Sequence, residues 1–375
     1  MSEIEDKFNL FFDQLNGEKI RMAYDASFNN PEIKFLCLYG AGAVGKNMLE
    51  YYRKAGIKVD FFCDRDPGKI GRSIEGIPCI SIDEIKAIKG EALIILSTGS
   101  VHEVLPILEA NGLTKYNHIN ESQVSHFDFF KDETCHGETR DNVMKLMRIL
   151  SDEQSKKILY TLLASMFSFN FNYEEIAKIN EGNQYFADDI ILLSDESFVD
   201  VGAFDGDTVK DFISRSNGQF REISAIEMNY YVFQRLEKNV STLNYPDKIH
   251  CYNCGLYDKT GVIKYSVSES GSAIINGRSS ETVKEGHSAR MDDLLDGKRV
   301  TFIKMDIEGA EMNALKGAQN IIRSQKPKCA ICVYHNPRHL WEVPFLLHEY
   351  CPSYKLYLRH HTELFYETVC YAIPE

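Results

Sequence analysis

An apolar run that ends in an acid and a glycine turn lies near the middle of the chain, from Ser197 to Thr208. The valine and aromatic residues around Asp200 are typical of a buried strand. Gly202 and Gly206 follow, and glycine allows positive φ angles and a close approach of a ligand to the backbone. The pattern predicts a strand, a tight turn and a helix, which favours an α/β fold with a ligand beside the turn.

The charge of this turn indicates what it can bind. A phosphate-binding P-loop needs a Lys-Ser/Thr pair after its last glycine, whereas this chain has Asp207 and Thr208 there. Asp200, Asp205 and Asp207 would repel a pyrophosphate, but they suit a ligand with hydroxyl groups and a positive centre. S-adenosylmethionine has a ribose, an amino group and a sulfonium. The alternative is a structural strand-to-helix turn in another α/β protein.

More apolar runs follow the turn, and we expect each of them to be a strand of one sheet. They span residues 223–229, 249–254, 300–306 and 329–334, and a closing β-hairpin is expected from 355–361 and 368–373. The polar or turn residues at the ends of the runs are Glu227, Gly255 with Leu256, Asp306 with Glu308, and His335. An acid in the position of Glu227 is placed to bind both hydroxyls of a ribose.

Residues 31–125 show a second α/β pattern. A buried run is followed by Gly40, Gly42 and Gly45 in a GxGxxG turn and then by a helical segment. A second run ends at Asp64, about 20 residues after the glycines, which is the layout of a dinucleotide-binding fold. We therefore predict a smaller Rossmann-like domain, with these glycines and Asp64 as a candidate nucleotide site.

The ligand of this front domain stays open. Charged residues from 64 to 71 crowd the place where a ribose would lie, and no substrate-binding half of a dehydrogenase follows. The pattern resembles small domains at the front of sugar-modifying bacterial proteins. NAD(P) binding, nucleotide-sugar binding and a docking role are compatible with it, and we expect no hydride transfer.

Helical periodicity precedes and follows the front domain. Residues 1–30 predict an N-terminal helical segment with an amphipathic helix that includes Phe8 and Ile20. Residues 126–188 predict a helical connector. The expected organisation is therefore a helical segment, a Rossmann-like domain, a connector and a second α/β domain at 189–375.

The overall composition excludes several classes of partner. At 375 residues the chain is long enough for two or three domains. A formal net charge of −13 argues against a general nucleic-acid binder and against a protein of anionic membrane surfaces. The acidic first residues lack the apolar core of a signal peptide, and no apolar run approaches bilayer length. We expect a cytoplasmic protein without a membrane span.

Two pairs of cysteines have C-x-x-C spacing, Cys251 with Cys254 and Cys329 with Cys332. Both pairs lie in apolar, strand-like stretches, where residues three apart point to opposite faces. We therefore interpret them as core residues in a reducing compartment and not as a zinc site.

The second half of the chain resembles the FkbM family of S-adenosylmethionine-dependent methyltransferases. The similar segments are 199–203, 303–311, 334–335, 358–361 and 367–369, and the Lys-Met-Asp-Ile-Glu-Gly-Ala-Glu block is the most specific of them. The resemblance implies a class I methyltransferase fold, with a mainly parallel seven-stranded sheet whose last strand is antiparallel. It also implies O-methylation, since family members commonly methylate hydroxyls of sugars and secondary metabolites.

The resemblance also assigns roles to residues of this chain. Those implied for S-adenosylmethionine are Asp200, Gly202, Ala203 and Gly206 at the methionine part, Glu227 at the ribose, and Gly255 with Leu256 at the adenine. Asp306, Glu308 and His335 are the candidates for removing the proton of the acceptor hydroxyl. His335 is the expected base, because a free imidazole titrates near neutral pH, and Asp306 would orient the hydroxyl.

Alternatives remain at this point. Glu308 could be an acid that favours the first turn of a helix, and His335 could cap a strand. His360 and His361 could join Asp306 and Glu308 in a metal cluster, but adjacent histidines on a strand face opposite ways, so no metal site is predicted. A nucleotide-sugar- or NAD(P)-binding protein or oxidoreductase that uses the front glycine turn is the alternative function.

The identity of the acceptor cannot be read from the sequence. We expect a small molecule, with a sugar, a nucleotide sugar or a glycan as the candidates. A homo-oligomer is compatible with the sequence.

Overall fold

The computed structural model describes residues 3–15, 30–119, 123–124, 126–169, 171–187, 190–267, 273–274 and 283–375. The chain divides into two compact units, each built from three separate stretches. Unit 1 comprises Met1–Met147, Lys156–Asn180 and Thr362–Tyr366, and unit 2 comprises Arg148–Ser155, Glu181–His361 and Glu367–Glu375. The residues predicted as a connector, 126–188, are thus shared between the units, and Ile20 lies outside the described residues.

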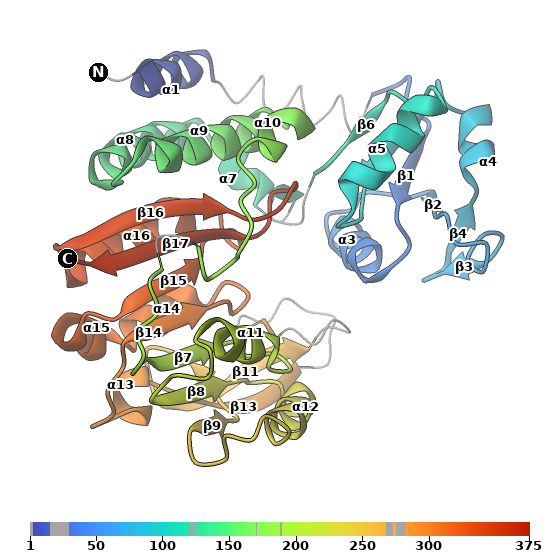
Figure 1. Ribbon diagram of the computed structural model, residues 1–375. Coiled ribbons are helices and arrows are strands. Elements are labelled where there is room, and N and C mark those ends of the chain that lie inside the picture. Colours follow the sequence, from blue (N-terminus) through green and yellow to red (C-terminus); the bar gives the residue numbers. More distant parts are fainter. Residues whose placement is uncertain are drawn as a thin grey trace. The chain divides into compact units, whose positions relative to one another are not determined.

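Unit 1 contains a six-stranded sheet in the order β3-β4-β2-β1-β5-β6 (Figure 1). Neighbouring strands are parallel except β3 and β4, which are antiparallel. The strands are β1 (Phe35–Tyr39), β2 (Phe61–Cys63), β3 (Ser73–Ile74), β4 (Ile77–Ile80), β5 (Ala92–Leu96) and β6 (Tyr116–Asn117). β1 and β5 consist almost entirely of buried apolar residues, as parallel strands covered on both faces do. The front region therefore has the predicted parallel-rich α/β fold.

Helices α3 (Ala43–Lys54), α4 (Ile82–Ala87) and α5 (Val101–Ala110) follow strands of this sheet. The helices outside it are α1 (Glu3–Gln14), α7 (Phe127–Lys131), α8 (Glu133–Ile149), α9 (Glu153–Ser168) and α10 (Tyr173–Ala177). Aromatic contacts join several of them: the Phe8 and Tyr160 rings meet edge to face with centroids 5.1 Å apart, and those of Phe130 and Phe167 at 5.0 Å.

Unit 2 contains a seven-stranded sheet in the order β16-β17-β15-β14-β7-β8-β9 (Figure 1). The strands are β7 (Ser197–Val201), β8 (Glu222–Ile226), β9 (Ile249–Tyr252), β14 (Phe302–Met305), β15 (Lys328–Cys332), β16 (Tyr354–His360) and β17 (Thr368–Pro374). β17 lies between β15 and β16 and is antiparallel to both, whereas the other neighbours are parallel. This is the seven-stranded arrangement that the resemblance implied, and the predicted fold class is confirmed.

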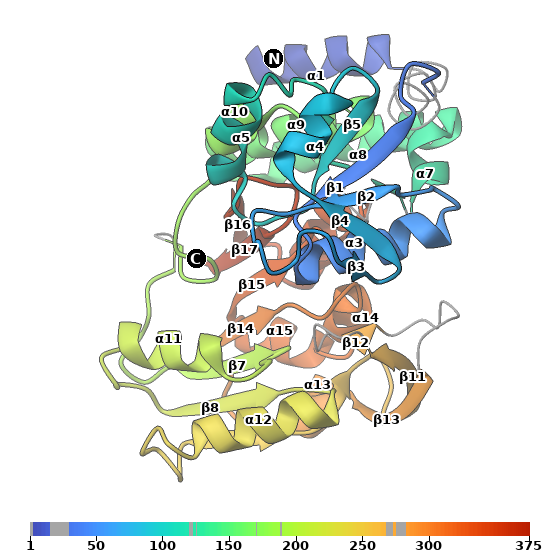
Figure 2. The ribbon, with the colours of Figure 1, turned by 90° about the vertical axis from the view of Figure 1, so that its right-hand side faces the viewer.

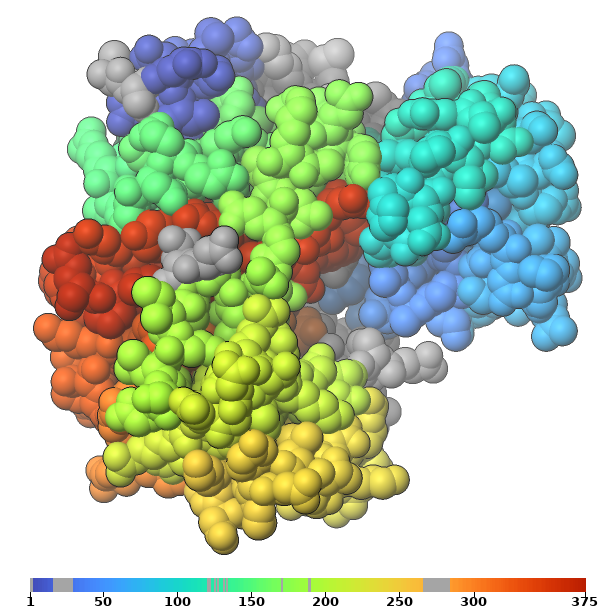
Figure 3. All heavy atoms as spheres, viewed as in Figure 1, coloured from blue at the N-terminus to red at the C-terminus, as the bar shows by residue number. Residues whose placement is uncertain are grey.

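The core of unit 2 is aromatic where β7 meets its helices. The ring of Phe198 stacks on Phe212 at 4.5 Å and contacts Phe302 at 5.0 Å. The helices are α11 (Asp207–Arg215), α12 (Tyr230–Val240), α13 (Met291–Leu294), α14 (Glu311–Lys316), α15 (Gln319–Gln325) and α16 (His339–Tyr350). α12 runs beside β8 (Figure 2), and the segments around α11 and α12 form the yellow-green and yellow surface in Figure 3. These rigid elements hold the turns that begin α11 and α12.

A second, smaller sheet in unit 2 has the order β10-β13-β11-β12. Its strands are β10 (Gly255–Leu256), β11 (Gly261–Val267), β12 (Ala273–Ile274) and β13 (Val283–Ala289). β13 was not predicted, because its sequence Val-Lys-Glu-Gly-His-Ser-Ala carries little apolar signal. The sheet matters for the site because β10 continues the chain from β9 past the end of β8.

None of the helices in the described part of the chain combines the length and the apolar character that a membrane crossing requires.

Candidate active site

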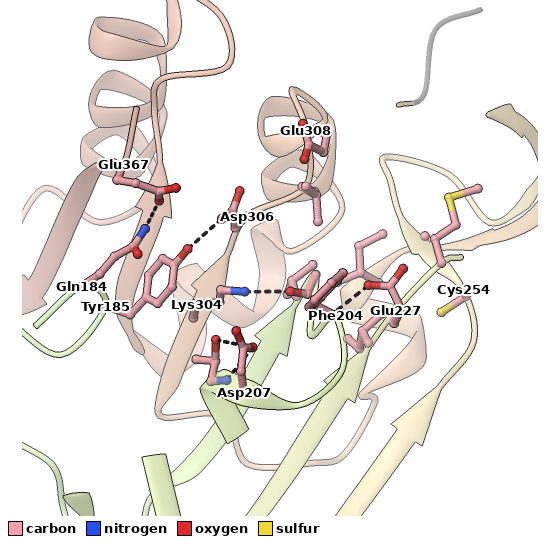
Figure 4. Close-up of a pocket in the computed structure, with 18 residues that line it drawn as sticks. Gln184, Tyr185, Phe204, Asp207, Glu227, Cys254, Lys304, Asp306, Glu308 and Glu367 are labelled. Atoms are coloured by element: carbon pink, nitrogen blue, oxygen red, sulfur yellow. Dashed lines mark hydrogen bonds between the residues drawn. The ribbon is translucent and has the colours of Figure 1, made fainter. Parts of the chain in front are cut away.

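A cavity of about 310 Å³ lies at the carboxyl ends of β7, β8 and β14 in unit 2 (Figure 4). Parallel α/β sheets bind their ligands at this edge, where the turns between strands and helices leave a crevice. The turn after β7, the residues after β8 and β14, and the start of β10 contribute most of the lining. Gln184 and Tyr185, from the segment before β7, and Glu367, just before β17, complete it.

The turn after β7 takes its shape from close packing. Gly202 has a φ of +79°, and a Cβ atom on it would lie 1.9 Å from the carbonyl oxygen of Asp306. Gly206 has a φ of +88° and is the N-cap of α11. Gly202 lines the cavity, whereas Gly206 and the fully buried Ala203 do not. The latter two residues therefore shape the turn without reaching the cavity.

Asp200 and Lys304 form an ion pair inside the sheet. They are partners in the β7–β14 register, their charged atoms are 3.0 Å apart, and their side chains are 0% and 3% exposed. The ammonium also donates a hydrogen bond of 2.7 Å to the carbonyl oxygen of Gly202. Burial lowers the pKa of Lys304, but the charges of Asp200 and Asp306 outweigh it, so the net pKa lies above its ordinary value.

The expected direct contact of Asp200 with a cofactor is therefore corrected. Asp200 is completely buried and does not line the cavity, because its carboxylate turns to Lys304. Lys304, in contrast, lines the cavity and holds Gly202. In the sequence it could be recognised as a lysine inside an apolar strand, because a buried lysine requires an acid on a neighbouring strand.

Glu227 lies at one end of the cavity, after β8 (Figure 4). One carboxylate oxygen accepts a 3.1 Å hydrogen bond from the backbone N–H of Phe204, and the other accepts one of 2.7 Å from that of Asn229. Burial raises the pKa of Glu227 to about 7, although these two donors lower it. Gly255 and Leu256 also line the cavity.

Asp306 lies in the middle of the cavity, after β14 (Figure 4). The hydroxyl of Tyr185 donates a 2.7 Å hydrogen bond to its carboxylate, and that of Tyr334 donates a longer one of 3.3 Å. Two donors fix the orientation of this carboxylate. The contribution of Tyr185 could not be predicted, since it precedes the strand in a stretch without a recognisable motif.

His335 does not have the role that its sequence position suggested. Its Nδ1 lies 2.9 Å from the buried carboxylate of Glu311, and its Nε2 lies 3.5 Å from Asp306 and 3.6 Å from Glu308. Burial lowers the pKa of His335, but the charge and hydrogen bond of Glu311 and the charges of Glu308 and Asp306 outweigh it and raise the pKa to about 10.

The expectation that His335 is a free base near neutral pH is therefore corrected. At neutral pH its ring holds a proton, and the side chain does not line the cavity. It acts as a cation between three carboxylates. Of the three residues predicted to act on the acceptor hydroxyl, Asp306 and Glu308 line the cavity.

Several residues with strained backbone conformations lie around the cavity. Ten described non-glycine residues have positive φ angles, and four of them line it: Tyr185, Phe204, Glu308 and Glu367. Such conformations cost about 1–3 kcal/mol each and persist where the surrounding structure enforces them, which is common at functional sites. Glu308 is thus more than an acid in a first helical turn, because its own backbone is held in an unfavourable conformation.

A metal ion has one candidate position among the described residues. Asp306, Glu311 and His335 offer ligand atoms within 4.8 Å of one another. His360 and His361 do not join them: Nδ1 of His360 lies 2.8 Å from the hydroxyl of Thr368, and the ring nitrogens of His361 lie near the Glu181 carbonyl and the Tyr371 hydroxyl. The alternative cluster considered from the sequence is therefore wrong.

The front glycine turn in unit 1 is explained by its own packing. Gly40 has a φ of +115°, and a Cβ on Gly45 would lie 1.9 Å from the carbonyl oxygen of Gly40; Gly42 has open space at that position. The carboxylate of Asp64 accepts hydrogen bonds from the backbone N–H of Ala41 (2.9 Å) and from Lys69 (2.8 Å). Asp64 is thus held by protein groups at the place where a ribose would need it.

Comparison with known proteins identifies the second half of the chain. Residues 200–362 match the sequence model of the methyltransferase FkbM domain. The structure is similar to that of methyltransferase FkbM from Methylobacillus flagellatus KT, with a TM-score of 0.73 and 21% identity over 99% of each chain. No curated protein sequence matches the chain.

Two further solved structures show weaker similarity, each with a TM-score of 0.30. One is an S-adenosylmethionine-dependent methyltransferase from Aquifex aeolicus, at 14% identity over 62% of this chain and 96% of that chain. The other is precorrin-6y C5,15-methyltransferase from Geobacter metallireducens GS-15, at 10% identity over 53% and 85%.

Proposed function

Since residues 200–362 form a methyltransferase FkbM domain, we propose that this enzyme transfers a methyl group from S-adenosylmethionine to a hydroxyl of a small molecule, with a sugar, a nucleotide sugar or a glycan as the candidates. The observation that carries the proposal is the cavity at the carboxyl ends of β7, β8 and β14, where Glu227 and Asp306 lie about a common space (Figure 4). Both a donor and an acceptor have to meet there.

Donor binding is assigned to the end of the cavity at Glu227. Its carboxylate would accept hydrogen bonds from the ribose hydroxyls, and the adenine would lie against Gly255 and Leu256. The backbone of Gly202, held by Lys304, would lie beside the methionine part. Asp200 supports this arrangement indirectly, because its carboxylate pairs with Lys304 and Lys304 holds Gly202.

The methyl-transfer step requires few reactive groups from the protein. The acceptor oxygen attacks the methyl carbon in line with the breaking bond to sulfur, so the enzyme contributes alignment and exclusion of water. The fixed carboxylate of Asp306 would accept a hydrogen bond from the acceptor hydroxyl and direct its lone pair. Glu308 would bind a second polar group of the acceptor.

The charges around the cavity favour an uncharged sugar over a nucleotide sugar. The acidic residues that line it are Asp207, Glu227, Asp306, Glu308 and Glu367. Lys304 is the one Lys or Arg among the lining residues, and it is already paired with Asp200. A diphosphate would therefore meet like charges in a water-poor space without a free cation.

A methyl-transfer assay with labelled S-adenosylmethionine tests this function. We expect transfer to neutral sugars or polysaccharide extracts at rates at least tenfold above transfer to nucleotide sugars. In the same experiment Glu227→Ala should weaken binding of S-adenosylhomocysteine by about 1.5–3 kcal/mol, the contribution of hydrogen bonds to a charged group. Unchanged affinity in a folded variant would remove Glu227 from the donor site.

For the front domain we propose a Rossmann-like fold without hydride chemistry. The ion pair of Asp64 with Lys69 supports this, because the lysine already neutralises the acid that a nucleotide ribose would use. Titration calorimetry with NADH should show no binding to the full chain. Micromolar binding that Asp64→Ala abolishes would favour the alternative function at the front glycine turn.

A further inference from the structure

Glu367 is a cavity residue for which donor binding and acceptor alignment provide no role. It precedes β17 directly, lines the cavity, and has a φ of +57°, a conformation that is unfavourable for glutamate. The amide of Gln184 donates a hydrogen bond to one of its carboxylate oxygens. In Figure 4, Glu367 and Glu227 lie on opposite sides of Asp306. Glu367 is thus at the end away from the proposed ribose.

The two acids at this end of the cavity have different surroundings. Asp306 receives hydrogen bonds from the hydroxyls of Tyr185 and Tyr334, which fix its orientation. Glu367 receives its bond from the neutral amide of Gln184, and it is buried beside the charge of Asp306. Burial and the charge of Asp306 raise the pKa of Glu367 to about 7, although Gln184, His335 and Lys304 lower it.

Neighbouring acids in different surroundings can divide the acid–base work between them. The two hydrogen bonds from tyrosine hydroxyls fix the carboxylate of Asp306, which suits it for orientation. His335 already carries a proton at neutral pH and cannot accept another. Glu367 remains as a cavity carboxylate with a raised pKa on the side away from the donor's ribose.

We propose that Glu367 is the general base that accepts the proton of the acceptor hydroxyl during methyl transfer. The proposal rests on the proposed function and adds the residue that completes its chemistry. The acceptor O–H bond breaks and its proton moves to the free carboxylate oxygen of Glu367. The acceptor oxygen forms the new bond to the methyl carbon, and the electron pair of the breaking C–S bond goes to sulfur.

The charges balance in this step. The sulfonium of S-adenosylmethionine becomes the neutral thioether of S-adenosylhomocysteine, and the carboxylate of Glu367 becomes a neutral acid. No oxidant, reductant or metal ion is needed. The proton returns to water after the products leave.

Turnover of Glu367→Gln at saturating donor tests the proposal. We expect a loss of about 10²–10⁴ in kcat, the usual contribution of a general base. The kcat of the wild-type enzyme should rise between pH 6 and 8, and the variant should lose this rise. Affinity for S-adenosylhomocysteine, measured by calorimetry, should change less than threefold. Wild-type kcat and pH dependence in Glu367→Gln would overturn the proposal.

Three other variants make the test specific. Asp306→Asn should lower kcat and keep the rise with pH, because it leaves Glu367 in place, but the midpoint should shift downward because the charge that raises the pKa of Glu367 is removed. Gln184→Leu should shift the midpoint of the pH profile upward, since the amide bond favours the charged form of Glu367. Glu349→Gln, an exposed acid on α16 whose side chain is 67% exposed, is the matched control and should leave turnover unchanged.

A second measurement needs no acceptor and separates this proposal from the proposed function. Infrared difference spectra of the full chain with S-adenosylhomocysteine bound, recorded between pH 5.5 and 8.5, should contain the band of a buried carboxylic acid that ionises near pH 7. Because Glu227 also has a pKa of about 7, the spectra of Glu227→Gln are the reference, and Glu367→Gln should remove the band that Glu227→Gln leaves. A band that is unchanged in the variant, or a Glu367 that is ionised throughout this range, would overturn the assignment even if no acceptor were yet known.

Discussion

Replacing Lys304 by methionine should destabilise unit 2 by about 3–5 kcal/mol, the usual cost of removing one partner of a buried ion pair. Lys304 and Asp200 face each other across β14 and β7, and their side chains are 3% and 0% exposed. Without the ammonium, Asp200 would keep its cost of desolvation and lose the attraction that offsets it. The carbonyl of Gly202 would also lose its 2.7 Å hydrogen bond.

The single tryptophan makes this loss measurable in unit 2 alone. Trp341 is the only tryptophan of the chain, and it is buried in α16, with 2% of its surface exposed. Urea unfolding followed by its fluorescence should therefore report unit 2. We expect the midpoint for Lys304→Met to move to lower urea by about 1–2 M, given the usual dependence of unfolding free energy on denaturant.

Two further variants decide whether the ion pair is the cause. Lys355→Met removes an exposed lysine paired with Glu375, with side chains 54% and 60% exposed, and should cost at most about 1 kcal/mol. Asp200→Leu combined with Lys304→Met removes both charges and should recover most of the stability lost in the single variant. A wild-type midpoint for Lys304→Met, or additive losses in the double variant, would refute the reasoning.

Three more predictions concern protonation and metal. Binding of S-adenosylhomocysteine should weaken about tenfold from pH 8 to pH 6, because Glu227 has a pKa of about 7 and must be ionised to accept hydrogen bonds, and calorimetry on Glu227→Gln should show a flat profile. Because the pKa of His335 is raised, its protonated ring should stabilise unit 2 fully below pH 6.5 and progressively less as the pH rises toward 10. The difference in unfolding free energy between wild type and His335→Gln should therefore shrink over that range. A constant difference would contradict the ion network. Removal of divalent cations with EDTA should leave methyl transfer unchanged, because protonated His335 already places a positive charge between the carboxylates of Asp306 and Glu311. A loss that Mg²⁺ restores would place a metal there.

The sequence was most informative for strands that can be recognised from their own residues. The apolar runs that became β7, β8, β14 and β15 are buried along almost their whole length, and the hairpin predicted at the end became β16 and β17. Buried parallel strands are continuous apolar runs, so their pattern does not depend on partners. β13 was missed because its alternating polar residues suit a sheet with one solvent-exposed face, and such a pattern is weak in a short strand.

The site was harder to predict because its residues take their properties from distant neighbours. Nothing near His335 in the sequence indicates that Glu311 lies 2.9 Å away and fixes a proton on the ring. Asp200 likewise was predicted to contact the ligand, whereas in the structure it pairs with Lys304 from another strand. Residue type and strand position predicted some of the side chains that line the cavity, such as Glu227, Asp306 and Glu308, whereas their protonation depends on contacts that only the tertiary structure provides.

The position of β17 in the large sheet has a consequence for synthesis. It is the last of the seven strands to be made, yet it lies inside the sheet, between β15 and β16. At the usual 5–20 residues per second, translation from the end of β15 to the end of β17 takes roughly 2–8 s, during which β15 has an unpaired edge. An apolar edge of this kind recruits other strands. Newly made chains should therefore depend on a holding chaperone in this interval, and slower translation of the segment before β17 should increase aggregation of the nascent protein without altering the stability of the finished one.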